Sequence, residues 1–142
     1  MKKFFTLLLT LSLIMSLGAT AFATATVEEA NVPTGDYTVE EMLSILLKDE
    51  YQAKALYEAV IKQHGNVNPF ANLINAEENH IEILTSLMTA KGFNLPAITV
   101  SAAAPSDLAT ALKAGEEAEI ANIALYEKML AQDNLPADVR DV

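Results

Sequence analysis

The sequence predicts an all-α protein whose long helices pack side by side in an antiparallel bundle. Three observations favour this fold class. Within three segments between residues 39 and 132, apolar side chains recur every three, four and seven positions, which is the period of an amphipathic helix. Turns rich in glycine, proline and asparagine separate these segments. No alternating run of valine, isoleucine and threonine is long enough to build a sheet.

The first helix is predicted over residues 39–64. Thr38 and Glu41 have the spacing of a capping box, in which each side chain accepts a hydrogen bond from the backbone N–H of the other residue. Gly65 follows the last apolar turn and can adopt the left-handed conformation that commonly ends a helix. Both ends of this helix are therefore marked in the sequence.

The second helix is predicted over residues 69–91. Asn68 followed by Pro69 is typical of an N-cap and a first helical position, and Gly92 follows the last periodic turn. Residues 93–105 contain two prolines and a run of alanines. We expect this segment to be a connection that runs along the bundle.

A third helix is predicted over residues 107–132. Ser106 can serve as its N-cap, and Asn134 and Pro136 stop the helical pattern after it. The three helices together are expected to form one helical domain over residues 38–142.

The N-terminal region has the pattern of a secretory signal peptide over residues 1–23. Lys2 and Lys3 precede an apolar run over 4–17, and the small-residue pattern Ala-Phe-Ala at 21–23 suits cleavage. The run is short for a membrane span. We therefore expect a secreted or cell-envelope protein that leaves the membrane after cleavage.

The mature chain is strongly acidic, and its N-terminal segment 24–37 is expected to be flexible. Without residues 1–23, seven basic residues remain against nineteen acidic ones, a formal charge of −12. This charge argues against nucleic acid and anionic lipid as partners, whereas cations remain attractive partners. Taken alone, the charge is better explained by solubility in a secreted protein. The chain has no cysteine, which excludes disulfides and iron–sulfur clusters. Any metal must therefore bind to carboxylate or imidazole.

One short pattern occurs twice in this chain. Residues 50–58 read EYQAKALYE and residues 119–127 read EIANIALYE, so in each copy a glutamate precedes the pair Tyr-Glu by seven positions. Glu50 follows Leu46 by four residues on the apolar stripe of its helix, and Glu119 occupies the matching position on the third helix. Both carboxylates are expected to face the core.

Glu77 and His80 form a Glu-x-x-His pair between the two copies, on the core-facing stripe of the second helix. Buried carboxylates are costly without a cation or a hydrogen-bond partner. One divalent centre would neutralise Glu77 together with Glu50 and Glu119, while His80 adds a nitrogen ligand. Oxygen-rich ligands with imidazole suit iron or manganese, and zinc is an alternative.

Three further polar residues are predicted to surround the ligands without binding metal. Tyr57 and Tyr126 follow the paired glutamates and can hydrogen-bond a carboxylate, although core tyrosines are the alternative interpretation. Asn122 lies on the Glu119 side of its helix and can orient a ligand. Six other acidic residues are expected in solvent or at the rim, with Glu116 also a candidate alternative ligand: Glu58, Glu78, Glu82, Glu116, Glu117 and Glu127.

These residues resemble the ferritin-like superfamily, especially its rubrerythrin-like members and a secreted bacterial branch. The resemblance implies a four-helix bundle of two helix hairpins around a di-iron or di-manganese centre. It gives Glu50 and Glu119 the roles of terminal or bridging carboxylates, Glu77 that of a bridging carboxylate, and His80 that of a nitrogen ligand. The implied activities are Fe(II) oxidation and peroxide reduction, those of a di-iron oxidoreductase.

The chain departs from that pattern at its C-terminal end. The two copies are offset by 69 residues, so a second Glu-x-x-His would fall beyond Val142. Residues 138–142 correspond to 69–73 and are expected to form the first turn of a truncated fourth helix. A partner in a homodimer could supply the missing helix. Two other functions remain open, a metal-binding protein without turnover and a non-catalytic helical interaction module in which the glutamates pair with lysines and water.

Overall fold

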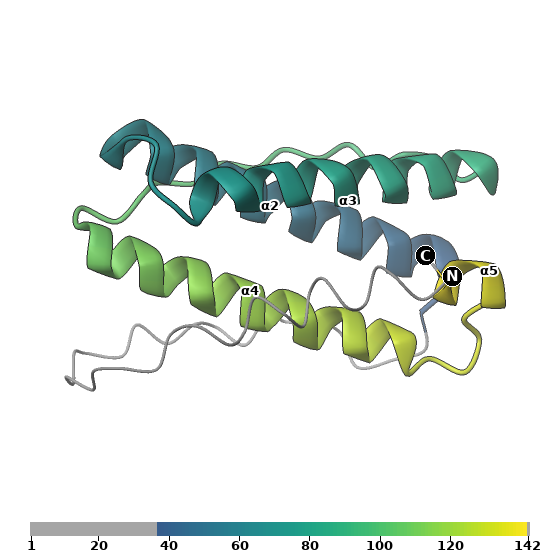
Figure 1. The fold of residues 1–142 in the computed structure, drawn as a ribbon. Coiled ribbons are helices and arrows are strands. Elements are labelled where there is room, and N and C mark those ends of the chain that lie inside the picture. Colours follow the sequence, from purple (N-terminus) through teal and green to yellow (C-terminus); the bar gives the residue numbers. More distant parts are fainter. Residues whose placement is uncertain (1–36, 142) are drawn as a thin grey trace.

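The structure, a computed structural model, describes residues 37–141 (Figure 1). This part of the chain contains three long helices and one short helix, and no strand. The helices are α2 (Val39–His64), α3 (Phe70–Ala90), α4 (Leu108–Leu130) and α5 (Ala137–Arg140). The prediction of an all-α fold is confirmed, and the three long helices lie within two residues of their expected bounds.

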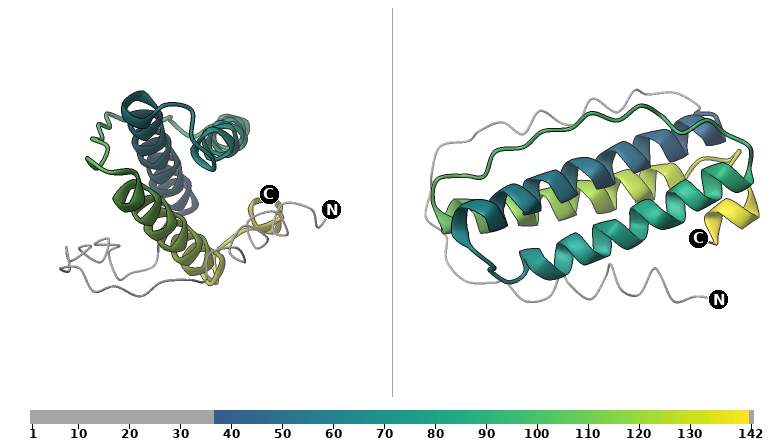
Figure 2. Two further views of the ribbon diagram at one scale, coloured as in Figure 1. Left: turned by 60° about the vertical axis from the view of Figure 1, so that its left-hand side comes forward. Right: turned by 90° about the horizontal axis from the view of Figure 1, so that it is seen from above.

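Helix α2 lies at the centre of the arrangement. It packs against both α3 and α4, which lie on different sides of it (Figure 2). A short turn makes α2 and α3 an antiparallel hairpin. The segment between α3 and α4 then runs back along the bundle, so that α4 is antiparallel to α2 as well (Figures 1 and 2).

Local sequence signals set the ends of α2 as predicted. The Glu41 backbone N–H donates to Thr38 Oγ1 at 3.2 Å, and the Thr38 backbone N–H donates to Glu41 Oε2 at 2.8 Å. At the other end Gly65 has a φ of 86°, a left-handed conformation that glycine adopts without a steric penalty. The capping box and the terminal glycine were both predicted correctly.

Two other helix starts differ from the prediction by one residue. Helix α3 begins at Phe70 with Pro69, and not Asn68, at the N-cap, and no side chain caps it. Helix α4 begins at Leu108, where Asp107 takes the place expected for Ser106. The Asp107 carboxylate accepts the Thr110 backbone N–H at 2.9 Å, and a carboxylate also interacts favourably with the positive end of the helix dipole.

The core is divided into two apolar clusters. The first lies between the start of α2 and the ends of α3 and α4, and the second lies between the end of α2 and the starts of α3 and α4. The buried members of the first are Tyr37, Met42, Leu43, Leu46, Leu47, Leu84, Met88, Leu125 and Met129. Those of the second are Tyr57, Val60, Phe70, Leu73 and Ala111. The buried polar residues lie between these clusters along the helices.

Side-chain contacts hold the connecting segments in place. Gln63 Nε2 donates to the Pro105 carbonyl oxygen at 2.9 Å, which fixes the long connection to the end of α2. Arg140 donates to the Leu130 carbonyl oxygen at 2.6 Å, and Lys91 pairs with Asp138 at 2.7 Å. These contacts fix the short helix α5, which overlaps the range 138–142 in which a helical turn was expected.

Several expectations concern the N-terminal region. The expected signal peptide over 1–23 and the segment 24–36 lie outside the described residues. Tyr37 departs from the expected flexible segment because its side chain is only 7% exposed and belongs to the first apolar cluster. In the described part of the chain, no helix has the length and apolar character needed to cross a membrane.

Gly115 allows close packing between α4 and Phe70 at the start of α3. A Cβ atom at Gly115 would lie 2.9 Å from Phe70 Cε1, and the Phe70 ring is 1% exposed and packs against Tyr57 with ring centroids 5.7 Å apart. We predict that Gly115→Ala lowers the free energy of unfolding by about 1 kcal/mol, because overpacking costs about 1–3 kcal/mol and exceeds the gain in helix propensity. Urea denaturation measures this change.

Phe70→Leu is the matched control for this substitution. In that background the smaller side chain leaves room for the new methyl group, so Gly115→Ala should no longer destabilise. A Gly115→Ala protein that is more stable than the parent would contradict the close contact.

Candidate metal centre

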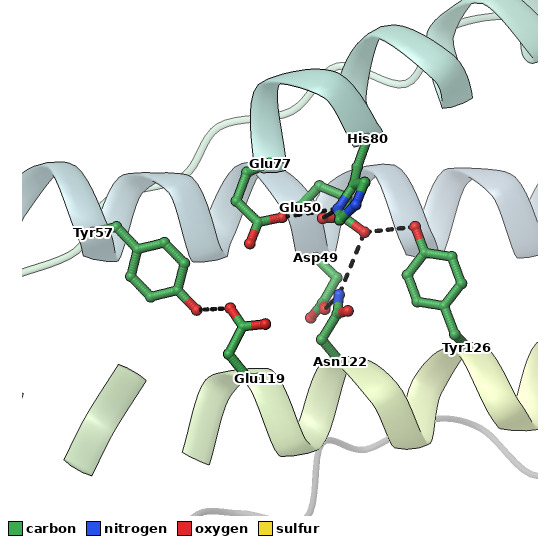
Figure 3. Close-up of polar contacts among 8 residues, drawn as sticks. All are labelled: Asp49, Glu50, Tyr57, Glu77, His80, Glu119, Asn122 and Tyr126. Atoms are coloured by element: carbon green, nitrogen blue, oxygen red, sulfur yellow. Dashed lines mark hydrogen bonds and ion pairs between the residues drawn. The ribbon is translucent and has the colours of Figure 1, made fainter. Parts of the chain in front are cut away.

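Three side chains from two helices bring potential metal ligands together. Glu50 comes from α2, and Glu77 and His80 come from adjacent turns of α3 (Figure 3). One ligand atom from each lies within 4.8 Å of the others. Glu50 is 0% exposed and Glu77 4% exposed, whereas the His80 side chain keeps 20% exposure. The site therefore lies inside the bundle and reaches solvent on the His80 side.

The His80 ring lies between the two carboxylates. Its Nδ1 atom is 3.1 Å from Glu50 Oε2 and 3.3 Å from Glu77 Oε2. A protonated Nδ1 donates a hydrogen bond to this pair, and a positive imidazolium reduces the repulsion between the two acids. The same three atoms could instead surround a metal cation, which would take the place of the proton.

The pKa values of the three groups reflect this proximity. Burial raises the pKa of Glu50, but the hydrogen bonds with His80, Glu77 and Tyr126 and the positive charge of His80 together outweigh that effect and lower the pKa to about 2. Burial raises the pKa of Glu77 to about 8, and the neighbouring Glu50 carboxylate adds to the shift. Burial lowers the pKa of His80, but the hydrogen bonds to Glu50 and Glu77 raise it to about 10. Without metal at neutral pH, Glu50 is charged, His80 is cationic and Glu77 holds a proton.

Two tyrosine–glutamate pairs connect α2 and α4 reciprocally. Tyr126 on α4 donates its hydroxyl to Glu50 Oε1 on α2 at 2.5 Å. Tyr57 on α2 donates to Glu119 Oε1 on α4 at the same distance (Figure 3). Burial and the negative charge of the partner glutamate raise the pKa of both tyrosines, so both remain donors. The two copies of the sequence pattern thus lie on antiparallel helices, and an approximate two-fold rotation relates the Tyr57–Glu119 pair to the Tyr126–Glu50 pair.

Glu119 is the predicted ligand that the structure places apart from the other three. It is partly buried and bound to Tyr57, and it is not in the group formed by Glu50, Glu77 and His80. Burial raises the pKa of Glu119, which the hydrogen bond from Tyr57 partly offsets. Three of the four predicted ligands therefore come together. The fourth, Glu119, lies beside Tyr57, as Glu50 lies beside Tyr126.

Asn122 contacts the site as predicted, but one of its partners was missed. Its Nδ2 atom donates to Glu50 Oε1 at 3.3 Å and to Asp49 Oδ2 at 2.9 Å. Asp49 follows Leu46 by three residues and Met42 by seven, and both of these are core residues. This helical spacing was the signal that could have identified Asp49 as a residue at the site.

The remaining acidic residues do not join the site. All six glutamates expected in solvent or at the rim are exposed, and none of them, Glu116 included, belongs to the group formed by Glu50, Glu77 and His80. In the part of the chain that the structure describes, every fully buried side-chain nitrogen and oxygen has a hydrogen-bond partner. The fit to a metal thus rests on the donor set: two carboxylate oxygens and one imidazole nitrogen that face one another, as suits a divalent transition metal.

The chain was compared with protein-family models, with curated proteins and with solved structures, and none of them matches it. The geometry of the site therefore carries the functional argument.

We predict that the metal-free protein is most stable near pH 4.5. The lowered pKa of Glu50 makes stability rise with pH between about 2 and the unfolded value of 4.5. The raised pKa of Glu77 makes the stability fall between pH 4.5 and about pH 8. The raised pKa of His80 makes the stability fall between pH 6.5 and about pH 10. Thermal unfolding in the presence of a chelator, measured from pH 2 to pH 10, checks this profile.

Glu77→Gln is the control for the pH profile, since it keeps the side-chain shape and removes one titrating group. The decline between pH 4.5 and pH 8 should become shallower in this variant, while the decline above pH 8 from His80 remains. Identical profiles for the two proteins would contradict the assigned protonation of Glu77.

Proposed function

We propose that this protein binds a divalent transition-metal ion through Glu50, Glu77 and His80. The observation that carries the proposal is the meeting of three ligand atoms within 4.8 Å in the interior of a helical bundle. Two of them belong to carboxylates that are almost fully buried, an environment that disfavours their charge unless a cation is near. A metal ion would neutralise both.

The ligand types narrow the choice of metal. Two oxygens and one imidazole nitrogen suit iron and manganese, and zinc is the alternative. The surrounding side chains prepare the site because Tyr126 and Asn122 donate to Glu50 Oε1 and leave its Oε2 atom facing His80. Such contacts around the ligands commonly tune metal affinity.

A finer form of the proposal is a secreted, ferritin-like protein with a di-iron centre. The support is the reciprocal arrangement of α2 and α4, in which Glu119 with Tyr57 repeats Glu50 with Tyr126. In this proposal Glu119 belongs to a second metal position. Further ligands for that position would come from a helix of a homodimer partner.

A pair of irons at such a centre would couple the oxidation of two Fe(II) ions to the two-electron reduction of peroxide. The residues of this chain would exclude bulk water from the ligands, keep the carboxylates oriented and hold protons on Tyr57 and Tyr126. A metal-binding protein without turnover needs the same residues.

A second candidate function is a helical interaction module that binds no metal. One observation favours it: within the described residues no fully buried polar side-chain atom lacks a partner. The hydrogen bonds among Glu50, Glu77 and His80 would then serve only to hold α2 and α3 together.

Metal binding separates the two candidates. We predict that the purified protein, reconstituted with Fe(II) or Mn(II), holds stoichiometric metal, and that Glu77→Ala/His80→Ala holds none, because two of the three ligands are gone. Elemental analysis after gel filtration measures the metal content. About two metals per chain or per dimer would support the paired centre.

Glu78→Ala/Asn79→Ala is the matched control for that experiment. It changes two exposed neighbours on the same helix and should leave the metal content unchanged. Circular dichroism should show equal helicity for all three proteins. Failure of the parent protein to retain metal would rule out the proposed function and favour the interaction module.

Proton release gives an independent test of the ligands. At pH 7, His80 with a pKa of about 10 and Glu77 with a pKa of about 8 are both largely protonated. A metal must displace these protons, so we predict release of about two protons per metal and an affinity that rises with pH. Calorimetric titrations in buffers of different ionisation enthalpy measure the number, and a value near zero would argue against binding at these residues.

A further inference from the structure

The amide of Asn122 lies between two carboxylates of consecutive residues on α2. Its Nδ2 atom is 2.9 Å from Asp49 Oδ2 and 3.3 Å from Glu50 Oε1 (Figure 3). An amide nitrogen carries two hydrogens, so it can donate one to each carboxylate. Asn122 is 6% exposed, and its position inside the bundle limits competition from water for these bonds.

Asp49 fixes which end of the Asn122 amide faces α2. The oxygen and the NH₂ group of an asparagine have nearly the same shape, so hydrogen bonding decides the orientation of the amide. The bond to Asp49 is the shorter of the two. With the amide reversed, its oxygen would face two carboxylates that offer it no hydrogen when ionised.

The two oxygens of Glu50 have different partners as a result. Oε1 accepts the Tyr126 hydroxyl at 2.5 Å and the Asn122 amide at 3.3 Å. Oε2 faces His80 Nδ1 at 3.1 Å. Two hydrogen-bond donors from α4 thus bind Glu50 Oε1, and Glu50 Oε2 is directed toward the proposed metal ligands on α3.

We propose that Asp49 is a positioning residue that acts through Asn122 to keep Glu50 Oε1 hydrogen-bonded, so that Glu50 binds metal through Oε2 alone. This inference rests on the proposed metal-binding function. Asp49 itself does not contact the metal. Its contribution is the orientation of the amide that, together with Tyr126, restricts Glu50 to one coordinating oxygen.

The test uses Co(II), whose visible absorption reports the number and geometry of its ligands. In the full chain, Asp49→Ala should weaken Co(II) binding by about tenfold, at the lower end of the effect of losing a contact around a ligand. It should also change the absorption spectrum, because Tyr126 alone then holds Glu50 Oε1 and the carboxylate can turn relative to the metal. Asp49→Asn should keep the affinity and spectrum close to those of the parent, since its side-chain oxygen still accepts from Asn122.

A double-mutant cycle separates positioning from the loss of a nearby charge. In an Asn122→Ala background, removal of Asp49 should cause no further loss of affinity, because the residue through which it acts is absent. Glu58→Ala, which removes an exposed carboxylate from the same helix, should bind Co(II) like the parent. Asp49→Ser, whose side chain is too short to reach the amide, replaces Asp49→Ala if that variant does not fold.

Each outcome bears on a different proposal. Parent-like binding and spectrum for Asp49→Ala would overturn the inference while the metal site stands. If Asp49→Asn binds Co(II) as weakly as Asp49→Ala, the loss of charge explains the weaker binding, and the inference is overturned. The same holds if removal of Asp49 lowers the affinity as much in the Asn122→Ala background as in the parent. A parent protein that binds no Co(II), Fe(II) or Mn(II) would overturn the proposed function, and the inference with it.

Discussion

The burial of the Glu50 carboxylate is the constraint on which the rest of the site depends. Glu50 is 0% exposed at the centre of the middle helix, and an unpaired charge there would cost several kcal/mol. The surrounding helices supply its partners: His80 from α3, and Tyr126 and Asn122 from α4. Because these contacts require particular positions of both helices, one buried charge helps to fix the register of α2 against its two neighbours.

This constraint also explains the division of the core. A polar layer in the middle of the bundle separates two apolar clusters, one on each side along the helix axes. Each cluster contributes packing that the polar layer cannot provide. The reciprocal pairs Tyr57–Glu119 and Tyr126–Glu50 connect the layer to both clusters, since Tyr57 belongs to the second cluster and Tyr126 packs against the first. Helix α4 is thereby held to α2 at both ends of the site.

Much of the fold was predictable because its signals are local. Periodicity located the three long helices, and the capping box gave the correct start of α2. The apolar stripe identified Glu50, Glu77 and His80. The separate position of Glu119 was not predictable, because it depends on how far α4 lies from α3, and helical periodicity contains no such distance. Similarly, the sequence suggested that each tyrosine serves a nearby carboxylate, whereas the structure pairs it with the glutamate of the other helix.

Glu77 gives the strongest physical reason to favour metal binding over a purely structural network. Glu50 accepts hydrogen bonds from several donors, and its lowered pKa shows that the site stabilises its charge. Burial and Glu50 instead raise the pKa of Glu77 to about 8, so the fold alone disfavours the ionised form. A glutamine or an apolar side chain at this position would avoid that cost. A cation between Glu50, Glu77 and His80 would favour the ionised form of Glu77, because a metal ligand must carry the negative charge that the metal-free protein suppresses. Binding of the cation would also stabilise the folded state by mass action.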